Sequence, residues 1–289
     1  FFFKQKTAYE VSRSDWSSDV CSSDLTTRVP LALVNEPWLA GAKVVMLEPR
    51  RLAARAAASY MASTIGEDVG QTVGYRVRGE SRISKHTRIE VVTEGVLARM
   101  LSSDAALEDI GLVIFDEFHE RSLHADLGLA LVLETQRHLR EELRVLVMSA
   151  TLDGVAVSAL LADEGRSAPV LRSEGRMFPI ETHYRPPRRD ERVEATTARV
   201  IREALDATEG DVLVFLPGAG EQRRVAERLT GDMMAGVRVH TLHGSMPLAE
   251  QDAALAPARV GTRKVVLSTS VAETSLTVAG VRVVIDCGL

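Results

Sequence analysis

Two adjacent carboxylates, Asp116 and Glu117, are the residues of this sequence best suited to chemistry. They follow a short apolar run at residues 111–115, which is typical of a buried parallel strand. Open α/β sheets bind ligands at the carboxyl ends of such strands. Asp116 could hold the Mg²⁺ of a nucleotide through water, and Glu117 could polarise an attacking water, which is the chemistry of nucleotide hydrolysis. A lone pair of this kind is more often a solvated acidic turn, so the other motifs must decide.

Composition limits the function classes. The chain has 289 residues, 45% hydrophobic and 26% charged, which suits about two globular domains. No apolar run approaches the ~20 residues needed to span a membrane. Acidic residues outnumber basic ones by 40 to 35, so any nucleic-acid-binding surface must be local. The two cysteines, Cys21 and Cys287, predict neither a disulfide framework nor a zinc cluster, and we expect a cytoplasmic protein.

Residues 1–25 differ from the rest of the chain. They are rich in Ser and Asp, show no clear apolar period, and lack the regions of a signal peptide. Two stretches, residues 4–10 and 14–25, resemble a translated sequencing-library adapter. We therefore expect an artefactual segment fused to a gene fragment, and the alternative is a disordered N-terminal arm.

Thr26 and Thr27 stand at a plausible helix start. A phosphate-binding loop would place Gly-x-Gly-Lys just before such a threonine, so that backbone amides cradle phosphates and the lysine reaches the β and γ oxygens. Residues 22–25 read Ser-Ser-Asp-Leu instead. Thr26 could still offer a hydroxyl to Mg²⁺, but an N-cap is the simpler explanation of the pair.

Two strand-to-helix turns carry groups suited to a nucleic-acid backbone. Arg50 and Arg51 follow an expected strand at residues 43–47, and Thr93 follows one at residues 88–92. Guanidinium groups and helix N-termini can hold phosphates. The alternatives are a solvated basic helix start for the arginines and an N-cap for the threonine.

The expected strands and helices alternate along the chain. Strands are expected at residues 43–47, 73–78, 88–92, 111–115, 143–148, 211–216, 237–242, 264–267 and 281–285. This alternation predicts an α/β fold with parallel sheets and helices on both faces. The Gly- and Pro-containing residues 174–190 interrupt it, which predicts a linker between two domains at residues 26–173 and 191–289.

Five motifs occur in an order that a known family shares. They are residues 48–55 (EPRRLAAR), 93–97 (TEGVL), 116–122 (DEFHERS), 149–153 (SATLD) and 270–277 (SVAETSLT). Together they resemble the DEAH/DExH-box helicases of superfamily 2, and most closely the bacterial HrpB-type ATP-dependent helicases. The resemblance covers residues 26–289. It implies two tandem RecA-like domains, ATP and Mg²⁺ as cofactors, and a nucleic acid, expected to be single-stranded RNA, as partner.

The resemblance also implies a role for each matching residue. The catalytic set is Asp116, Glu117, His119, Ser149 and Thr151. The nucleotide would lie against Thr26, Thr27, Tyr60, Asp116, Glu117 and Leu255, with Thr26 and Asp116 holding Mg²⁺ largely through water. The groups expected to grip the nucleic-acid backbone are Arg50, Arg51, Thr93, Gly244, Ser268 and Thr269.

Departures from the family pattern weaken the expected activity. Leu25 stands where the phosphate-loop lysine belongs, and Tyr60 and Leu255 stand where relatives often stack the adenine. The first domain is expected to lack its phosphate-loop strand, and the second to be truncated before its arginine-rich motif. Because such an arginine can contribute roughly 10³–10⁵ in rate, we expect this polypeptide to hydrolyse ATP barely or not at all.

Three functions remain open. The leading one is an ATP-dependent RNA helicase. The alternatives are a catalytically dead RNA-binding module, and an RNA-stimulated NTPase that remodels ribonucleoprotein without unwinding. The lysine position separates the first two, and strand displacement measured beside ATP hydrolysis separates the first from the third. The sequence predicts no membrane partner and does not identify protein partners.

Overall fold

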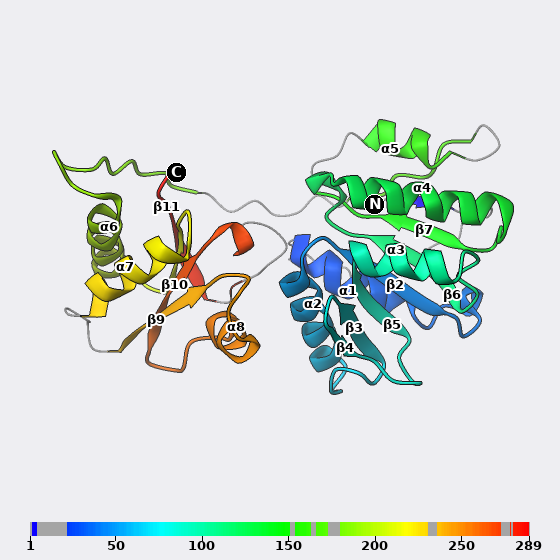
Figure 1. The fold of residues 1–289 in the computed structure, drawn as a ribbon, viewed down its shortest axis with the longest axis horizontal. Helices are drawn as coiled ribbons and strands as arrows, with labels where there is room; N and C mark the ends of the chain where they lie inside the picture. The colour runs from blue at the N-terminus through cyan, green and yellow to red at the C-terminus, as the bar shows by residue number, and fades with distance from the viewer. Residues whose placement is uncertain are drawn as a thin grey trace. The chain divides into compact units, whose positions relative to one another are not determined.

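The computed structural model describes residues 2–4, 22–150, 154–162, 166–172, 180–230, 236–272, 278 and 280–288. The chain divides into two compact α/β units, Phe1–Phe178 and Pro179–Leu289 (Figure 1). The division falls within the predicted linker at residues 174–190. Among the described residues, no helix combines the length and the apolar character that a membrane span requires.

The first unit is built on a seven-stranded sheet in the order β1-β7-β6-β2-β5-β3-β4. Its strands are β1 (Phe2–Lys4), β2 (Lys43–Glu48), β3 (Val73–Val77), β4 (Glu80–Arg82), β5 (Ile89–Thr93), β6 (Ile110–Phe115) and β7 (Arg144–Val147). The five central strands run parallel. The outer strands β1 and β4 pair antiparallel with β7 and β3. The sheet that was predicted to be parallel is therefore mixed, because short segments cover both of its edges.

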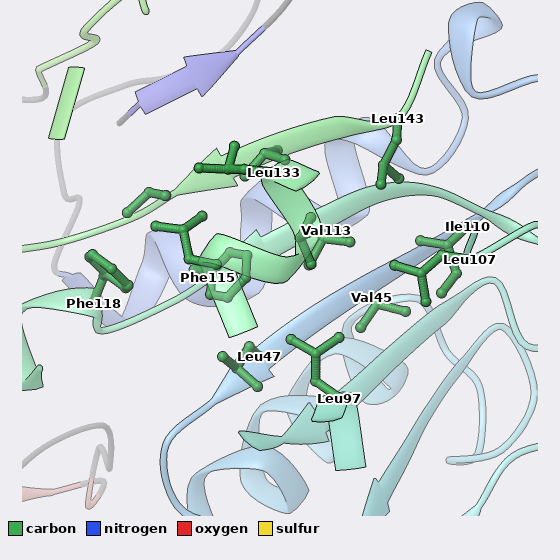
Figure 2. Packing of buried hydrophobic residues seen from close by; sticks show 14 of the residues in the cluster. Val45, Leu47, Leu97, Leu107, Ile110, Val113, Phe115, Phe118, Leu133 and Leu143 are labelled. Atoms are coloured by element: carbon green, nitrogen blue, oxygen red, sulfur yellow. The ribbon is translucent and has the colours of Figure 1, made fainter. Parts of the chain in front are cut away.

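Helices cover both faces of this sheet. They are α1 (Ser22–Leu33), α2 (Arg51–Thr64), α3 (Glu94–Ser103), α4 (Leu123–His138) and α5 (Gly154–Leu160). Along β2, Val45 and Leu47 pack with Leu97 of α3 and Leu133 of α4 in one cluster, part of which Figure 2 shows. The alternate residues of β2 pack against α1 and α2 in a second cluster. Both faces are buried, which explains why the central strands are near-continuous apolar runs.

The start of α1 corrects one prediction. The helix begins at Ser22, so Thr26 and Thr27 lie inside it, and the N-cap predicted for them is wrong. Ser and Asp favour the beginning of a helix, and residues 22–24 are Ser-Ser-Asp. The segment expected to lie outside the fold thus contributes the start of α1 and strand β1, while residues 5–21 lie outside the described residues.

The second unit contains a four-stranded sheet in the order β11-β8-β10-β9, and all of its pairings are parallel, as predicted. Its strands are β8 (Asp211–Phe215), β9 (Val237–Leu242), β10 (Arg263–Ser268) and β11 (Val281–Asp286). Its helices are α6 (Val193–Ala207), α7 (Ala219–Thr230) and α8 (Leu248–Leu255). Ile201 of α6 and Val225 of α7 pack against β8 and β10 in one cluster.

Candidate functional site

The carboxylate loop, residues 116–122, begins where β6 ends. The amide of Asp116 continues the sheet by donating to the Leu47 carbonyl at 3.1 Å. Glu117 then turns the chain in a left-handed conformation, φ 48° and ψ 34°, into the 3₁₀ helix η2 (Phe118–Glu120). Arg121 ends η2 with φ 45°. Positive φ is unfavourable for residues other than glycine and is concentrated at functional sites, so the two outliers mark this loop as a candidate site.

An aromatic anchor holds the loop in place. Phe118 is buried edge-on against Phe115, with ring centroids 6.2 Å apart and planes at 80° (Figure 2). The Phe118 amide donates to the carbonyl of Met148, just beyond β7, at 3.2 Å. The Arg121 guanidinium lies 5.5 Å from the Phe118 ring centroid. These contacts stabilise the strained backbone, because a displaced Phe118 would expose its ring to water.

Asp116 lies beside a second buried carboxyl, Glu48, at the end of β2. Its Oδ1 accepts the Glu117 amide at 2.8 Å, and the Thr26 side chain hydrogen-bonds to the same carboxylate. Burial raises the pKa of Asp116, and the Thr26 hydrogen bond opposes that shift. Burial, and then the Asp116 charge, raise the pKa of Glu48 well above its ordinary value.

One oxygen of each carboxyl lacks a donor other than the neighbouring carboxyl. Within the described part of the chain, no amide, guanidinium or Ser/Thr hydroxyl donates to Asp116 Oδ2 or to Glu48 Oε2, and the two carboxyls hydrogen-bond to each other when one of them is protonated. Two buried carboxyls side by side repel each other when both are ionised, and a cation between them would remove the repulsion. The donor set of carboxylate and hydroxyl oxygens is the one that Mg²⁺ prefers.

Glu117 and His119 form a linked pair. Glu117 Oε2 lies 3.2 Å from His119 Nε2, and His119 Nδ1 accepts the Ala150 amide at 3.4 Å. An accepting Nδ1 leaves the proton of a neutral imidazole on Nε2, which therefore donates to Glu117. Burial, followed by the charges of Asp116 and Glu120, raises the pKa of Glu117 to about 7. Glu117 is thus able to exchange a proton near neutral pH.

The segment after β7 reaches this pair through its backbone. Ser149 belongs to the predicted catalytic set, and its Oγ is buried without a hydrogen-bond partner among the described residues. The amide of the next residue, Ala150, makes the contact to His119. Thr151 lies outside the described residues. The catalytic roles expected for Ser149 and Thr151 stay predictions.

The predicted nucleic-acid contacts of the first unit lie at helix N-termini. Arg50 is the N-cap residue of α2 and Thr93 that of α3, and neither side chain caps its helix through a hydrogen bond to the described residues. Arg51, the first residue of α2, is exposed. Arg50 instead pairs with Glu120 of the carboxylate loop, Nη2 to Oε2 at 3.6 Å.

The two residues predicted near the adenine belong to different units. Tyr60, on α2 of the first unit, has 58% of its surface exposed. Leu255 is half-buried at the end of α8 in the second unit. Tyr60 is therefore available for stacking on a base, whereas Leu255 offers a smaller apolar surface.

The predicted contacts of the second unit gather at one edge of its sheet. Gly244 follows β9 and is exposed, and the amide of Thr269, which follows β10, donates to the Leu242 carbonyl at 3.2 Å. Ser268 is fully buried, and its hydroxyl donates to the Thr269 carbonyl at 2.7 Å. In this conformation, Ser268 braces the turn from inside rather than offering its hydroxyl to a ligand.

Two buried glutamines were not predicted from the sequence. Gln222 Nε2 donates to the Leu242 carbonyl at 3.0 Å, and Gln251 Nε2 donates to the Met246 carbonyl at 2.9 Å. Together they hold both ends of the turn that carries Gly244. Gln222 shares the apolar stripe of α7 with Val225, and a polar residue on such a stripe signals a buried partner.

Each of the two units matches a family model of helicases. A family model described as "DEAD/DEAH box helicase" matches residues 27–159, and one described as "Helicase conserved C-terminal domain" matches residues 195–289. The chain carries a DEAD/DEAH box helicase domain followed by a helicase C-terminal domain. Each unit therefore contains one helicase domain, and the predicted pair of RecA-like folds is confirmed.

Individual relatives agree. The chain is 48% identical to "ATP-dependent RNA helicase HrpB" of Escherichia coli over 91% of this chain and 32% of that protein. It is 31% identical to "ATP-dependent RNA helicase HrpA" of Borreliella burgdorferi over 92% of this chain and 32% of that protein. The chain thus spans about a third of the length of these relatives.

Solved structures show the same fold. A crystal structure of Escherichia coli DEAH/RHA helicase HrpB matches with a TM-score of 0.83 at 46% identity, over 93% of this chain and 34% of that chain. A second, described as the DExH-box NTPase HrpB of E. coli, matches with a TM-score of 0.71 at 46% identity, over 93% of this chain and 33% of that chain.

Proposed function

We propose that this chain supplies the two RecA-like domains of an ATP-dependent RNA helicase. The observation that carries the proposal is the carboxylate pair at the end of β6. Asp116 forms a hydrogen bond with the Thr26 side chain, and its buried Oδ2 has no amide or Ser/Thr hydroxyl donor among the described residues. Glu117 has a pKa of about 7, so it can take up a proton near neutral pH. The match of residues 27–159 to the DEAD/DEAH box helicase model supports this proposal.

Thr26 and Asp116 fit a Mg²⁺ ion. Their oxygens are hard ligands, and the buried Asp116 Oδ2 lies beside Glu48, where a positive charge would be stabilising. When bound, Mg²⁺ supplies charge that neutralises phosphate oxygens. Asp116 would hold the ion, largely through water, and Thr26 would orient Asp116.

Glu117 and His119 would handle the proton. Glu117 accepts a proton from an attacking water, and His119 Nε2–H keeps the Glu117 carboxylate oriented. Ser149 and Thr151 would relay the state of this pair to domain movement. Thr27, Tyr60 and Leu255 remain candidate contacts for the nucleotide.

Residues of both units would bind the sugar-phosphate backbone of the nucleic acid. In the first unit these are Arg50, Arg51 and Thr93, and in the second Gly244 and Thr269, with Ser268 supporting the turn. Contacts of this type are independent of sequence and weaken with salt. The relatives are named RNA helicases, which supports single-stranded RNA as the partner, and the two cysteines support a cytoplasmic location.

ATP turnover with and without RNA tests the proposal in three proteins. The first is the chain as given, the second carries Ser22→Gly, Asp24→Gly and Leu25→Lys, and the third adds Glu117→Gln to the second. We expect the first to turn over ATP barely or not at all, because Leu25 cannot bind phosphate. We expect the second to gain Mg²⁺-dependent ATP binding, and the third to bind ATP without hydrolysing it.

The results also separate the alternatives. RNA-stimulated turnover by the chain as given would contradict the argument from Leu25. RNA binding without ATP binding in any variant would favour the RNA-binding module. Turnover without displacement of a paired strand would favour the remodelling NTPase.

A further inference from the structure

The carboxylate loop touches the nucleic-acid turns at two points. Glu120 pairs with Arg50 at the start of α2, Nη2 to Oε2 at 3.6 Å. Two residues further along, the Ser122 hydroxyl donates to Glu94, the first residue of α3 after Thr93. The loop that holds the hydrolytic carboxylates is therefore tied to both helix starts that are proposed to grip nucleic acid.

The first of these ties is open to competition. The Arg50 and Glu120 side chains are 29% and 19% exposed, so a ligand can reach the pair from solvent. Arg50 Nη2 and Glu120 Oε2 lie 3.6 Å apart, whereas a guanidinium binds phosphate through two parallel hydrogen bonds at shorter distances. A phosphodiester is therefore a better partner for Arg50 than Glu120 is.

Displacing Glu120 would move the hydrolytic residues. The Glu120 amide donates to the Glu117 carbonyl at 2.9 Å, so the two residues lie on the same 3₁₀ turn. Glu117 already has a left-handed backbone, which leaves it little freedom to absorb a movement of its neighbour. A change at Arg50 thus reaches Glu117 over one turn of chain.

We infer that Glu120 is an internal substitute for a nucleic-acid phosphate at Arg50, so that single-stranded RNA displaces it and thereby releases the carboxylate loop. This inference rests on the proposed function, in which Arg50 holds the RNA backbone. It adds a residue to that function, because Glu120 controls both how tightly RNA binds and when the loop is free. Coupling of this kind is reciprocal.

Fluorescence anisotropy of a labelled single-stranded oligouridylate tests the inference with the full chain. Glu120→Gln removes the competitor, and we expect it to tighten binding about two- to fivefold, the effect of losing one part-exposed ion pair. Arg50→Gln should weaken binding. In the Arg50→Gln background, Glu120→Gln should change the affinity by less than about 1.5-fold, because the two residues act as a pair.

A matched control distinguishes direct competition between Glu120 and RNA for Arg50 from the general effect of removing one negative charge. Asp126 is near the loop and pairs with Arg121 at 2.9 Å, so Asp126→Asn removes one negative charge without touching Arg50. We expect no change in RNA affinity for this variant. If it tightens binding as much as Glu120→Gln does, or if Glu120→Gln acts equally without Arg50, the inference is overturned.

The remaining outcomes are also decisive. A chain that shows no salt-dependent RNA binding overturns the proposed function itself. A chain that binds RNA with an affinity unaffected by Glu120→Gln overturns only the inference. If Glu120→Gln does not fold, Glu120→Asp shortens the side chain while keeping the charge. Its affinity should still rise, and an unchanged affinity would contradict the competition.

Discussion

Asp116 and Asp211 are both buried aspartates in the two sheets, yet the structure uses them in opposite ways. Asp116 directly follows β6, and in the described part of the chain no amide or hydroxyl group other than the neighbouring Glu48 carboxyl donates to its Oδ2. Asp211 begins β8, and its Oδ1 accepts the Lys264 amide at 2.8 Å. A buried carboxylate that accepts a hydrogen bond from its own fold stabilises the folded state. A buried carboxylate that lacks such a donor is a candidate ligand-binding group.

Lys264 extends the contrast. Its buried ammonium donates to the carbonyls of Ala254 at 3.1 Å and Ala256 at 2.6 Å, where α8 ends. Burial lowers the pKa of Lys264, and the charge of Asp211 opposes that shift. In the second unit, buried charges hold helix and strand ends together. In the carboxylate loop of the first unit, we propose that the acidic side chains bind a cation and activate a water molecule.

The largest expected effect tests whether Asp211 stabilises the fold. Asp211→Ala leaves the buried Lys264 amide without its acceptor and removes the charge near the ammonium. We expect it to lower the free energy of unfolding of the second unit by about 3 kcal/mol, measured by urea unfolding. Asp206→Ala removes an exposed aspartate from α6 and should change the same quantity by less than about 0.5 kcal/mol. Equal effects would show that Asp211 is not structural.

The substitution Asp116→Asn tests whether Asp116, unlike Asp211, contributes no stability to the fold. The amide replaces a charge that burial disfavours, and it can donate to Glu48. At pH 8 without divalent cations, we expect the variant to be as stable as the original chain or more stable by up to about 2 kcal/mol. Urea unfolding again measures the difference. A loss of more than about 1 kcal/mol would mean that Asp116 is held by the fold in the same way as Asp211.

The substitution Glu117→Gln tests the comparison further, because its effect on the free energy of unfolding should depend on pH. Burial raises the pKa of folded Glu117 from 4.5 to about 7, so its ionisation destabilises the fold as the pH rises through that range. We expect the variant to be more stable than the original chain above pH 7, by about 1–2 kcal/mol because solvent screens part of the shift. The difference should vanish below pH 4.5, the ordinary value.

Thermal unfolding at several pH values measures this difference. Glu36→Gln, at an exposed position of the same unit, is the control and should show no such trend. A stability difference for Glu117→Gln that does not vary with pH would contradict the raised pKa.

Much of the architecture followed from the sequence because its signals are local. A buried strand that ends in charge, as β6 does at Asp116, can be recognised within six residues. The short strands β1 and β4 and the helices α5 and α8 were missed, because segments of three to eight residues carry too little apolar period to stand out. Helix α1 was started too late because residues 1–25 were set aside.

The finer features of the site depend on residues far apart in the chain. Arg50 and Glu120 meet only after β2 and β6 pair, so no local pattern shows that they form an ion pair. Glu48 did carry a signal, since it is a charge that ends an apolar run, as Asp116 is. The left-handed backbone at Glu117 is imposed by packing around Phe118 and could not be predicted from its residue type.

The central claim is that the buried carboxylates at Asp116 form a cation site rather than a structural pair. Its most direct test is the thermal unfolding midpoint of the first unit with increasing MgCl₂, at ionic strength held constant with NaCl. The account predicts that Mg²⁺ raises the midpoint of the original chain and of Asp211→Asn, but not that of Asp116→Asn. No shift in the original chain, or an equal shift with Asp116→Asn, would contradict it.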